Sequence, residues 1–353
     1  MHRVGILGLP SSGKSTLFEI LLQGAGASPA AGGVARDSVG VVRVPDARID
    51  RLSAMFTPKK TTYAQVQFTD TAAAGQASAR VQAKGQDLFA SVRNCEALLA
   101  VIRDFENPAV PAEGGVDAER DRNKLEGELV FNDLVIAEGR IEKIDKELRI
   151  GKKQGEREHA LLTRCRQVLE AGRPLRGETF DAEEEKLLRG FQLLSRKPLL
   201  LVYNRDERDS GTLPNPGPKA LAVSLKAHLE REVVALPPEE REAFRSELGI
   251  AEDGLSLVIR SCYELLGLIS FFTVGPDEVR AWTIRRGEKA VDAAGEIHSD
   301  LAKGFIRAEV IGWQALHDIG GEAKAREKGM LKLEGRDYVV KDGECLEIRF
   351  NRS

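Results

Sequence analysis

The sequence has little that points to a membrane, to an oxidising compartment or to a polyanion. It contains no run of about 18 apolar residues, so no transmembrane helix is expected. The formal net charge of −3 provides no global basic field to attract DNA, RNA or an anionic membrane. Four cysteines lie far apart without C-x-x-C spacing, which indicates free thiols in a reducing cytosol. The N-terminal stretch MHRVGILG enters a predicted strand without a charged-then-apolar leader. We therefore expect a cytoplasmic, monomeric protein that binds neither membrane nor DNA, and any RNA contact must come from a local patch.

Length and pattern indicate a multidomain α/β protein. The 353 residues suffice for two or three domains. Short apolar runs alternate with helical patterns, which favours a mostly parallel sheet that is covered on both faces. The helix near STLFEILLQG is expected to end at Gly24. Strands are predicted at residues 3–8, 39–45, 64–70, 96–105, 198–204 and 220–225.

The stretch GLPSSGKS matches the phosphate-loop pattern G-x-x-x-x-G-K-S. It lies between the first predicted strand and the first predicted helix, where backbone N–H groups can meet an anion. Lys14 can reach the β- and γ-phosphates, as the catalytic cation, and the Ser15 hydroxyl can ligate Mg²⁺. The predicted phosphate-binding residues are Gly8, Pro10, Ser11, Ser12, Gly13, Lys14, Ser15 and Thr16.

Residues at two later predicted strand ends complete the expected nucleotide site. Asp70 ends one strand, where its carboxylate can hold Mg²⁺ through water. Asn204 and Glu207 follow another strand and are expected to read the base. A guanine-binding N-K-x-D motif has aspartate at the fourth position, so the longer Glu207 disfavours guanine and could admit adenine. Ser224 and Leu225 are expected to close the base site from the next strand.

The stretch from 118 to 196 is predicted to be an inserted helical arm. Its apolar residues step by four and three, the 3.5-residue period of a coiled-coil seam. The seam consists of Val130, Leu134, Ala137, Ile141, Ile144 and Leu148. Asp181 and Glu184 have the spacing of a capping box at the start of a third helix. Two interpretations stay open, a stabilising appendage or a partner-binding arm.

The last 85 or so residues read as a separate α+β module. Strands are predicted within 279–287, 305–311 and 337–350, with a helix over 289–301 between the first two. Four arginines lie in or next to these strands and form either a solvated face, the commoner arrangement, or a surface for RNA phosphates: Arg280, Arg285, Arg286 and Arg307.

Taken together, these stretches resemble the YchF-type branch of the Obg-related P-loop NTPases over essentially the whole chain. The stretches that carry the resemblance are GILGLPSSGKSTLF, VGVVRVPDARIDRL, RPLRGETFDAEEEKLLRGFQLLSRKPLLLVYNRDE, EVRAWTIRRGEKAVDAAGEIHSDLAKGFIRAEVI and KLEGRDYVVKDGECLEIRFN. The resemblance implies a P-loop domain at 1–117 and 197–268, a coiled-coil arm at 118–196 and a ubiquitin-like TGS domain at 269–353. It also implies an N-x-x-E base motif at Asn204 and Glu207, ATP preferred over GTP, and a link to ribosomes and translation. The expected ligands are Mg²⁺ with ATP or ADP, and GTP or GDP as the alternative.

The sequence departs from the family pattern at the γ-phosphate end. Val34 stands where a switch threonine would complete the Mg²⁺ shell, and Ala73 replaces the glycine of D-x-x-G. Ala73 lacks the freedom of glycine to turn its peptide toward a γ-phosphate. Gln76 lies two residues too far from Asp70 to match a water-positioning glutamine. We expect nucleotide binding to persist better than hydrolysis, and three hypotheses stay open: a slow ATPase, a nucleotide-binding scaffold and a GTP switch.

Overall fold

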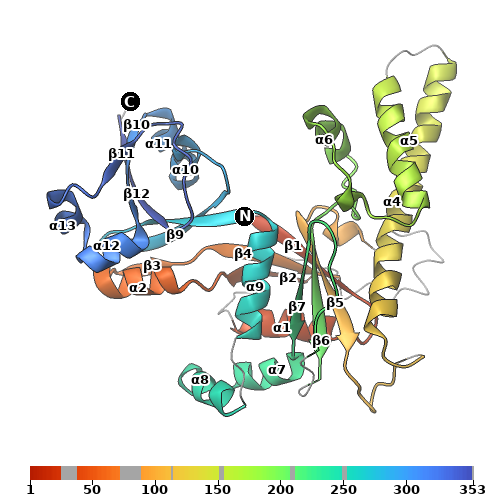
Figure 1. Ribbon diagram of the computed structural model, residues 1–353, viewed down its shortest axis with the longest axis horizontal. Helices are drawn as coiled ribbons and strands as arrows, with labels where there is room; N and C mark the ends of the chain where they lie inside the picture. Colours follow the sequence, from red (N-terminus) through yellow and green to blue (C-terminus); the bar gives the residue numbers. More distant parts are fainter. Residues whose placement is uncertain are drawn as a thin grey trace.

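The computed structural model describes residues 1–24, 38–71, 89–112, 114–150, 155–206, 211–248 and 253–351. A central sheet carries a long helical arm on one side and a second α/β unit on the other (Figure 1). Among the described residues, no helix is both long enough and apolar enough to cross a membrane.

The central sheet has the strand order β2-β4-β1-β5-β6-β7. Every neighbouring pair is parallel except β2 with β4, so the prediction of a mostly parallel sheet is confirmed. Its strands are β1 (His2–Gly8), β2 (Ser38–Arg43), β4 (Gln65–Asp70), β5 (Ala97–Asp104), β6 (Leu199–Arg205) and β7 (Ala220–Leu225).

Helices bury both faces of this sheet, which explains why the central strands β5 and β6 are apolar over most of their length. One face packs against α1 (Lys14–Gly24), α7 (Ala227–Ala235) and α9 (Gly254–Leu265). The other face packs against Leu125 and Leu129 at the root of α4 (Ala118–Arg149) and against the 3₁₀ turn η1 (Ala90–Val92). A short helix, α8 (Pro238–Glu247), follows α7, and α1 ends at Gly24 as predicted.

The arm is a helical hairpin of α4 and α5 (Glu156–Glu170), followed by η2 (Leu175–Gly177) and α6 (Ala182–Arg189). All six predicted seam residues belong to or pack against one arm core, with Ala137 and Ile144 fully buried. The predicted capping box is present, because Asp181 accepts from the backbone of α6 and Glu184 accepts from the backbone N–H of Asp181. The heptad pattern therefore correctly located the arm.

A buried carboxylate attaches the arm to the central sheet. Asp133 on α4 accepts hydrogen bonds from the backbone N–H groups of Leu194 (2.8 Å) and Ser195 (2.7 Å), and from Ser195 Oγ (2.6 Å). Burial raises the pKa of Asp133, and these hydrogen bonds oppose the shift. The root of the arm is thereby fixed just before β6.

The second sheet has the strand order β11-β10-β12-β8-β9-β3. It packs against α10 (Ala290–Ile297) over an apolar core that includes Phe271, Ile284 and Leu346. Its C-terminal strands are β8 (Leu268–Thr273), β9 (Glu278–Arg285), β10 (Phe305–Gly312), β11 (Lys332–Glu334) and β12 (Glu344–Phe350). Three more helices complete the unit: α11 (Ser299–Lys303), α12 (Trp313–Ile319) and α13 (Glu322–Glu327). The predicted strand within 337–350 is confined to β12.

The sixth strand of this sheet, β3 (Lys60–Thr62), comes from the N-terminal half of the chain. It lies between α2 (Ala47–Phe56) and β4, and it pairs in parallel with β9. Lys59 Nζ lies 2.7 Å from Asp277 Oδ1, and Thr62 Oγ1 donates to Glu278 Oε1 at 2.6 Å. Arg48 on α2 adds an ion pair with Asp342 at 2.8 Å. The C-terminal sheet therefore includes a strand from outside the predicted 269–353 range.

Candidate functional site

The phosphate loop joins β1 to α1, where buried Val4 and Ile6 hold the strand in the core. Ser11 and Gly13 have positive φ angles of 63° and 92°, and the second of these favours glycine. A Cβ at Gly13 would collide with the amide of Asn204, and a Cβ at Gly8 would lie 2.5 Å from Ser12 Oγ. The packing of the loop against Asn204 and Ser12 therefore requires both motif glycines, and their close approach to phosphate stays a prediction.

Ser12 contributes a buried polar atom to the loop. Its hydroxyl Oγ is buried, and within the described part of the chain it has no hydrogen-bond partner. Buried polar groups normally have partners. Phosphate oxygens or ordered water would satisfy this hydroxyl, so the loop fits an anionic ligand.

Lys14 and Asp70 meet directly beneath the loop. Lys14 Nζ donates to Asp70 Oδ1 at 2.6 Å, and the two residues are 8% and 2% exposed. Asp70 ends β4, which is hydrogen-bonded to β1, so the sheet register places its carboxylate beside the first residue of α1. Ser15 and Thr16 follow in the first turn of α1, with Ser15 exposed. The residues predicted to hold phosphate and Mg²⁺ therefore lie close together at the carboxyl ends of β1 and β4.

Asn204, near the end of β6, connects the loop to α7. Its Nδ2 donates to the carbonyl of Ser12 at 3.1 Å, and its Oδ1 accepts from the backbone N–H of Ala227 at 3.1 Å. The side chain is thus fixed between the phosphate loop and the N-terminus of a helix. Both ends of its amide are used, which leaves little freedom for it to rotate.

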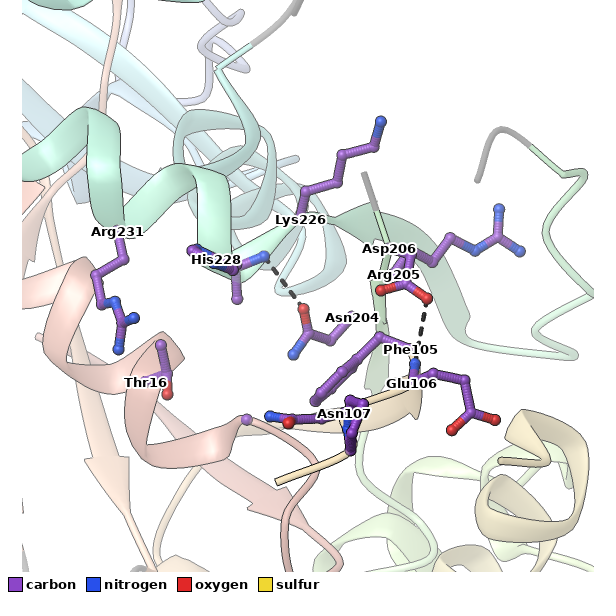
Figure 2. A pocket seen from close by; sticks show the side chains of 13 residues that line it. Thr16, Phe105, Glu106, Asn107, Asn204, Arg205, Asp206, Lys226, His228 and Arg231 are labelled. Carbon is purple, nitrogen blue, oxygen red and sulfur yellow. Dashed lines mark hydrogen bonds between the residues drawn. The ribbon is translucent and has the colours of Figure 1, made fainter. Parts of the chain in front are cut away.

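A cavity of about 690 Å³ opens beside Asn204 (Figure 2). Gly13 and Thr16 line its phosphate end, and α7 contributes Ala227, His228 and Arg231. The segment after β5 supplies the opposite wall: Phe105, Glu106, Asn107 and Pro108. Arg205, Asp206 and Lys226 complete the lining. A cavity at the carboxyl edge of a parallel sheet, with a helix N-terminus at one end, is the usual position of a nucleotide site.

Some predicted residues fall outside this lining or outside the described chain. Leu225 is buried in the core, and Ser224 precedes the lining residues of the β7–α7 connection. Pro10 and Ser11 lie in the loop itself. Outside the described residues are the base-reading candidate Glu207 and the altered switch positions Val34, Ala73 and Gln76.

Among the lining residues that sequence reasoning missed are Phe105, His228 and Arg231. Phe105 directly follows a buried parallel strand, and such positions gather at the ligand edge of the sheet. His228 and Arg231 lie one helical turn apart on α7, a spacing that could have indicated a shared face. Asp206, within the base motif, accepts a hydrogen bond at its Oδ2 from the backbone N–H of Glu106, at 3.1 Å.

The parallel sheet, the glycine loop and the adjoining cavity define a P-loop nucleotide-binding protein. A family model described as YchF-GTPase_C, a protein of unknown function (DUF933), matches residues 268–351. The chain is 36% identical to "Ribosome-binding ATPase YchF" of Bacillus subtilis, over 98% of each chain. It is also 36% identical to the protein of that name from Escherichia coli O157:H7, over 99% of each chain. The solved "YchF GTPase" of Schizosaccharomyces pombe aligns with a TM-score of 0.83 at 28% identity, over 99% of this chain and 97% of that one. The chain belongs to the YchF family.

Proposed function

We propose that this protein binds a purine nucleoside triphosphate with Mg²⁺, prefers ATP to GTP, and hydrolyses it slowly. The observation that carries the proposal is the cluster of Lys14, Asp70 and Asn204 around one phosphate loop, and Gly13 of that loop lines the adjoining cavity together with Asn204. The relatives from B. subtilis and E. coli are named ATPases, which supports hydrolysis as the activity.

At the phosphate end, Lys14 has two alternative partners. In the structure its ammonium pairs with Asp70, and a bound triphosphate would offer it oxygens of higher charge. Asp70, released from Lys14, and the Ser15 hydroxyl would then hold Mg²⁺. The metal would neutralise charge on the phosphates when bound. Lys14 would supply the remaining positive charge, and the loop backbone would orient the phosphates.

At the other end, the base would enter the cavity between α7 and the segment after β5. Asn204 fixes the floor of this region, and Phe105 offers an aromatic surface. Glu207, one methylene longer than the aspartate of guanine-binding motifs, supports a preference for adenine.

A ribosomal partner is proposed from the names of the relatives and from the surface of the C-terminal sheet. Two of its four candidate arginines have partners in the structure: Arg285 pairs with Glu96, and Arg280 lies over the ring of Trp282 at 3.7 Å. Arg286 and Arg307 are exposed and have no acidic partner among the described residues. These two are the stronger candidates for contacts with rRNA phosphates, and the arm supplies a second surface.

Calorimetric titration of Lys14→Ala with ATP, ADP, GTP and GDP tests the nucleotide proposal. Loss of all measurable binding is expected, because Lys14 is the cation of the loop. Lys59→Ala is the control, since Lys59 forms an exposed ion pair at the C-terminal sheet. Unchanged affinity of Lys14→Ala for every nucleotide would remove the P-loop assignment.

A second candidate function, a scaffold that holds nucleotide without turning it over, is favoured by Val34 and Ala73 at the switch positions. Single-turnover hydrolysis of ATP, measured with and without ribosomes, separates the two. Turnover that ribosomes accelerate supports the ATPase, and ribosome co-sedimentation with no turnover in either case supports the scaffold.

A further inference from the structure

Arg103 is a buried arginine at the end of β5, and only 4% of it is exposed. Its Nε donates to the carbonyl of Phe105 at 3.2 Å, and its Nη2 donates to the carbonyl of Val110 at 2.7 Å. The guanidinium also lies over the ring of Phe105, with Cζ 4.7 Å from the ring centroid. A single side chain therefore holds both ends of the Phe105–Val110 segment and one face of its aromatic ring.

Within the described residues, the side-chain hydrogen bonds of this arginine go to the carbonyls of Phe105 and Val110, and no ion pair joins it to a carboxylate. Arginine is rarely buried without a counter-charge, because desolvating the guanidinium is costly. Carbonyl acceptors and an aromatic face offset part of that cost. An apolar residue would fill a core position here without this desolvation cost. The arginine is therefore explained by the backbone segment that its hydrogen bonds hold in place.

The segment that Arg103 holds is a wall of the nucleotide cavity. Phe105, Glu106, Asn107 and Pro108 all line it. In the sheet register Arg103 lies directly opposite Asn204, so the base-reading strand and the wall are adjacent. The backbone N–H of Glu106 donates to Asp206, which ties the wall to a residue within the base motif.

We propose that Arg103 is a positioning residue that sets the base end of the cavity by holding the Phe105 ring and the Phe105–Val110 backbone in place. The proposal rests on the nucleotide-binding function proposed above. In this proposal Arg103 contributes to the affinity for the base of the nucleotide, and it makes no contact with the phosphates. A substitution at this position should therefore lower the affinity for nucleotides and leave the affinity for inorganic phosphate chains unchanged.

The test measures binding of ATP and of inorganic tripolyphosphate, both with Mg²⁺, to the full chain. Arg103→Lys keeps the charge, but one ammonium cannot reproduce the planar contact with two carbonyls and a ring. We expect ATP affinity to fall about tenfold, the loss of one base–aromatic contact, with tripolyphosphate affinity unchanged within about twofold. Arg241→Lys is the matched control, because Arg241 also donates from Nε and Nη2 to two carbonyls, Leu236 and Val234, away from the cavity.

A double-mutant cycle with Phe105→Leu adds a readout that a merely structural role would not move. If Arg103 acts through the ring, the double variant should bind ATP with the same affinity as the single variant that binds ATP more weakly. Fully additive losses, wild-type ATP affinity in Arg103→Lys, or an equal loss of ATP and tripolyphosphate would each overturn the proposal. If Arg103→Lys does not fold, Arg103→Met replaces it, since an apolar residue of similar length avoids an unpaired buried charge. Wild-type protein that binds neither ligand would instead overturn the proposed function itself.

Discussion

Lys14 Nζ and Asp70 Oδ1 lie 2.6 Å apart, and the ion pair that they form is almost completely buried. The carboxylate proposed to help hold Mg²⁺ therefore neutralises the phosphate-binding cation in the structure. A bound nucleotide has to compete with this pair, so the pair stabilises the nucleotide-free protein and lowers its affinity for nucleotide.

Asp70→Asn should lower the free energy of unfolding without nucleotide by about 3 kcal/mol, because it leaves a buried ammonium without a counter-charge. Urea denaturation measures this change. Replacing both partners, as Lys14→Met with Asp70→Asn, should recover most of it. Asp277→Asn, which removes the exposed partner of Lys59, is the control and should change stability by no more than about 0.5 kcal/mol. Equal effects of Asp70→Asn and Asp277→Asn would contradict the role assigned to burial.

Glu207→Asp should move base preference from adenine toward guanine, because aspartate has the length that accepts two hydrogen bonds from guanine. A change of about tenfold in the ratio of ATP to GTP affinity corresponds to about 1.4 kcal/mol. Competition binding with both nucleotides measures the ratio. A wild-type protein that already prefers GTP by about tenfold or more would show that the base argument is wrong.

ATP and ADP should bind with affinities within about tenfold of each other, or about 1.4 kcal/mol. Val34 offers no ligand oxygen, and Ala73 lacks the freedom of glycine, so little distinguishes a triphosphate from a diphosphate. Val34→Thr combined with Ala73→Gly should raise single-turnover hydrolysis. Brisk wild-type hydrolysis with ATP-specific hydrogen-exchange protection of residues 30–38 would show that another residue replaces the lost switch.

Glu230 should make the protein less stable as pH rises. Burial raises its pKa above the ordinary value of 4.5, although its Oε1 accepts from the backbone N–H of Gly254 at 2.8 Å and Arg245 lies near. At Glu230 the folded state thus binds a proton more tightly than the unfolded chain does. The resulting contribution to the free energy of unfolding is fully present below about pH 4.5 and is lost as pH rises through the pKa of Glu230 in the folded state.

Glu230→Gln keeps the shape and the acceptor, so its stability relative to wild type should increase from about pH 4 to about pH 8. Thermal unfolding across this range measures the difference. Glu232→Gln, at an exposed position on the same helix, should show a much flatter difference. If the stability of Glu230→Gln relative to wild type instead falls as pH rises, the ion pair of Glu230 with Arg245 outweighs the effect of burial on the pKa.

The sequence predicted the elements whose signals are local. Residues 8–15 carry a phosphate loop whose glycines the structure requires, and the heptad steps of α4 located the arm core. The Asp181–Glu184 spacing predicted a capping box that is present. Each of these patterns depends on residues within a few turns of one another.

Features that depend on tertiary contacts could not be predicted in this way. Phe105, His228 and Arg231 become neighbours only because β5 and β7 end at the same edge of the sheet. The function of Arg103 depends on a carbonyl seven residues further along the chain. A run of three residues, Lys60–Thr62, has too little periodicity to indicate a strand, and none to indicate which sheet it joins.

The position of β3 also bears on how the chain is made. Lys59 and Asp277, which join β3 to β9, are 218 residues apart, so a ribosome needs roughly 10 to 40 s to synthesise the chain between them. During that time β3 has been made but its partner strand has not, and the nucleotide domain therefore carries an unpaired strand edge. The C-terminal sheet, once made, forms against an edge that is already part of a preceding domain. Cutting the chain between these domains would separate β9 from this edge partner, so a C-terminal fragment expressed alone would expose an edge that the intact protein covers.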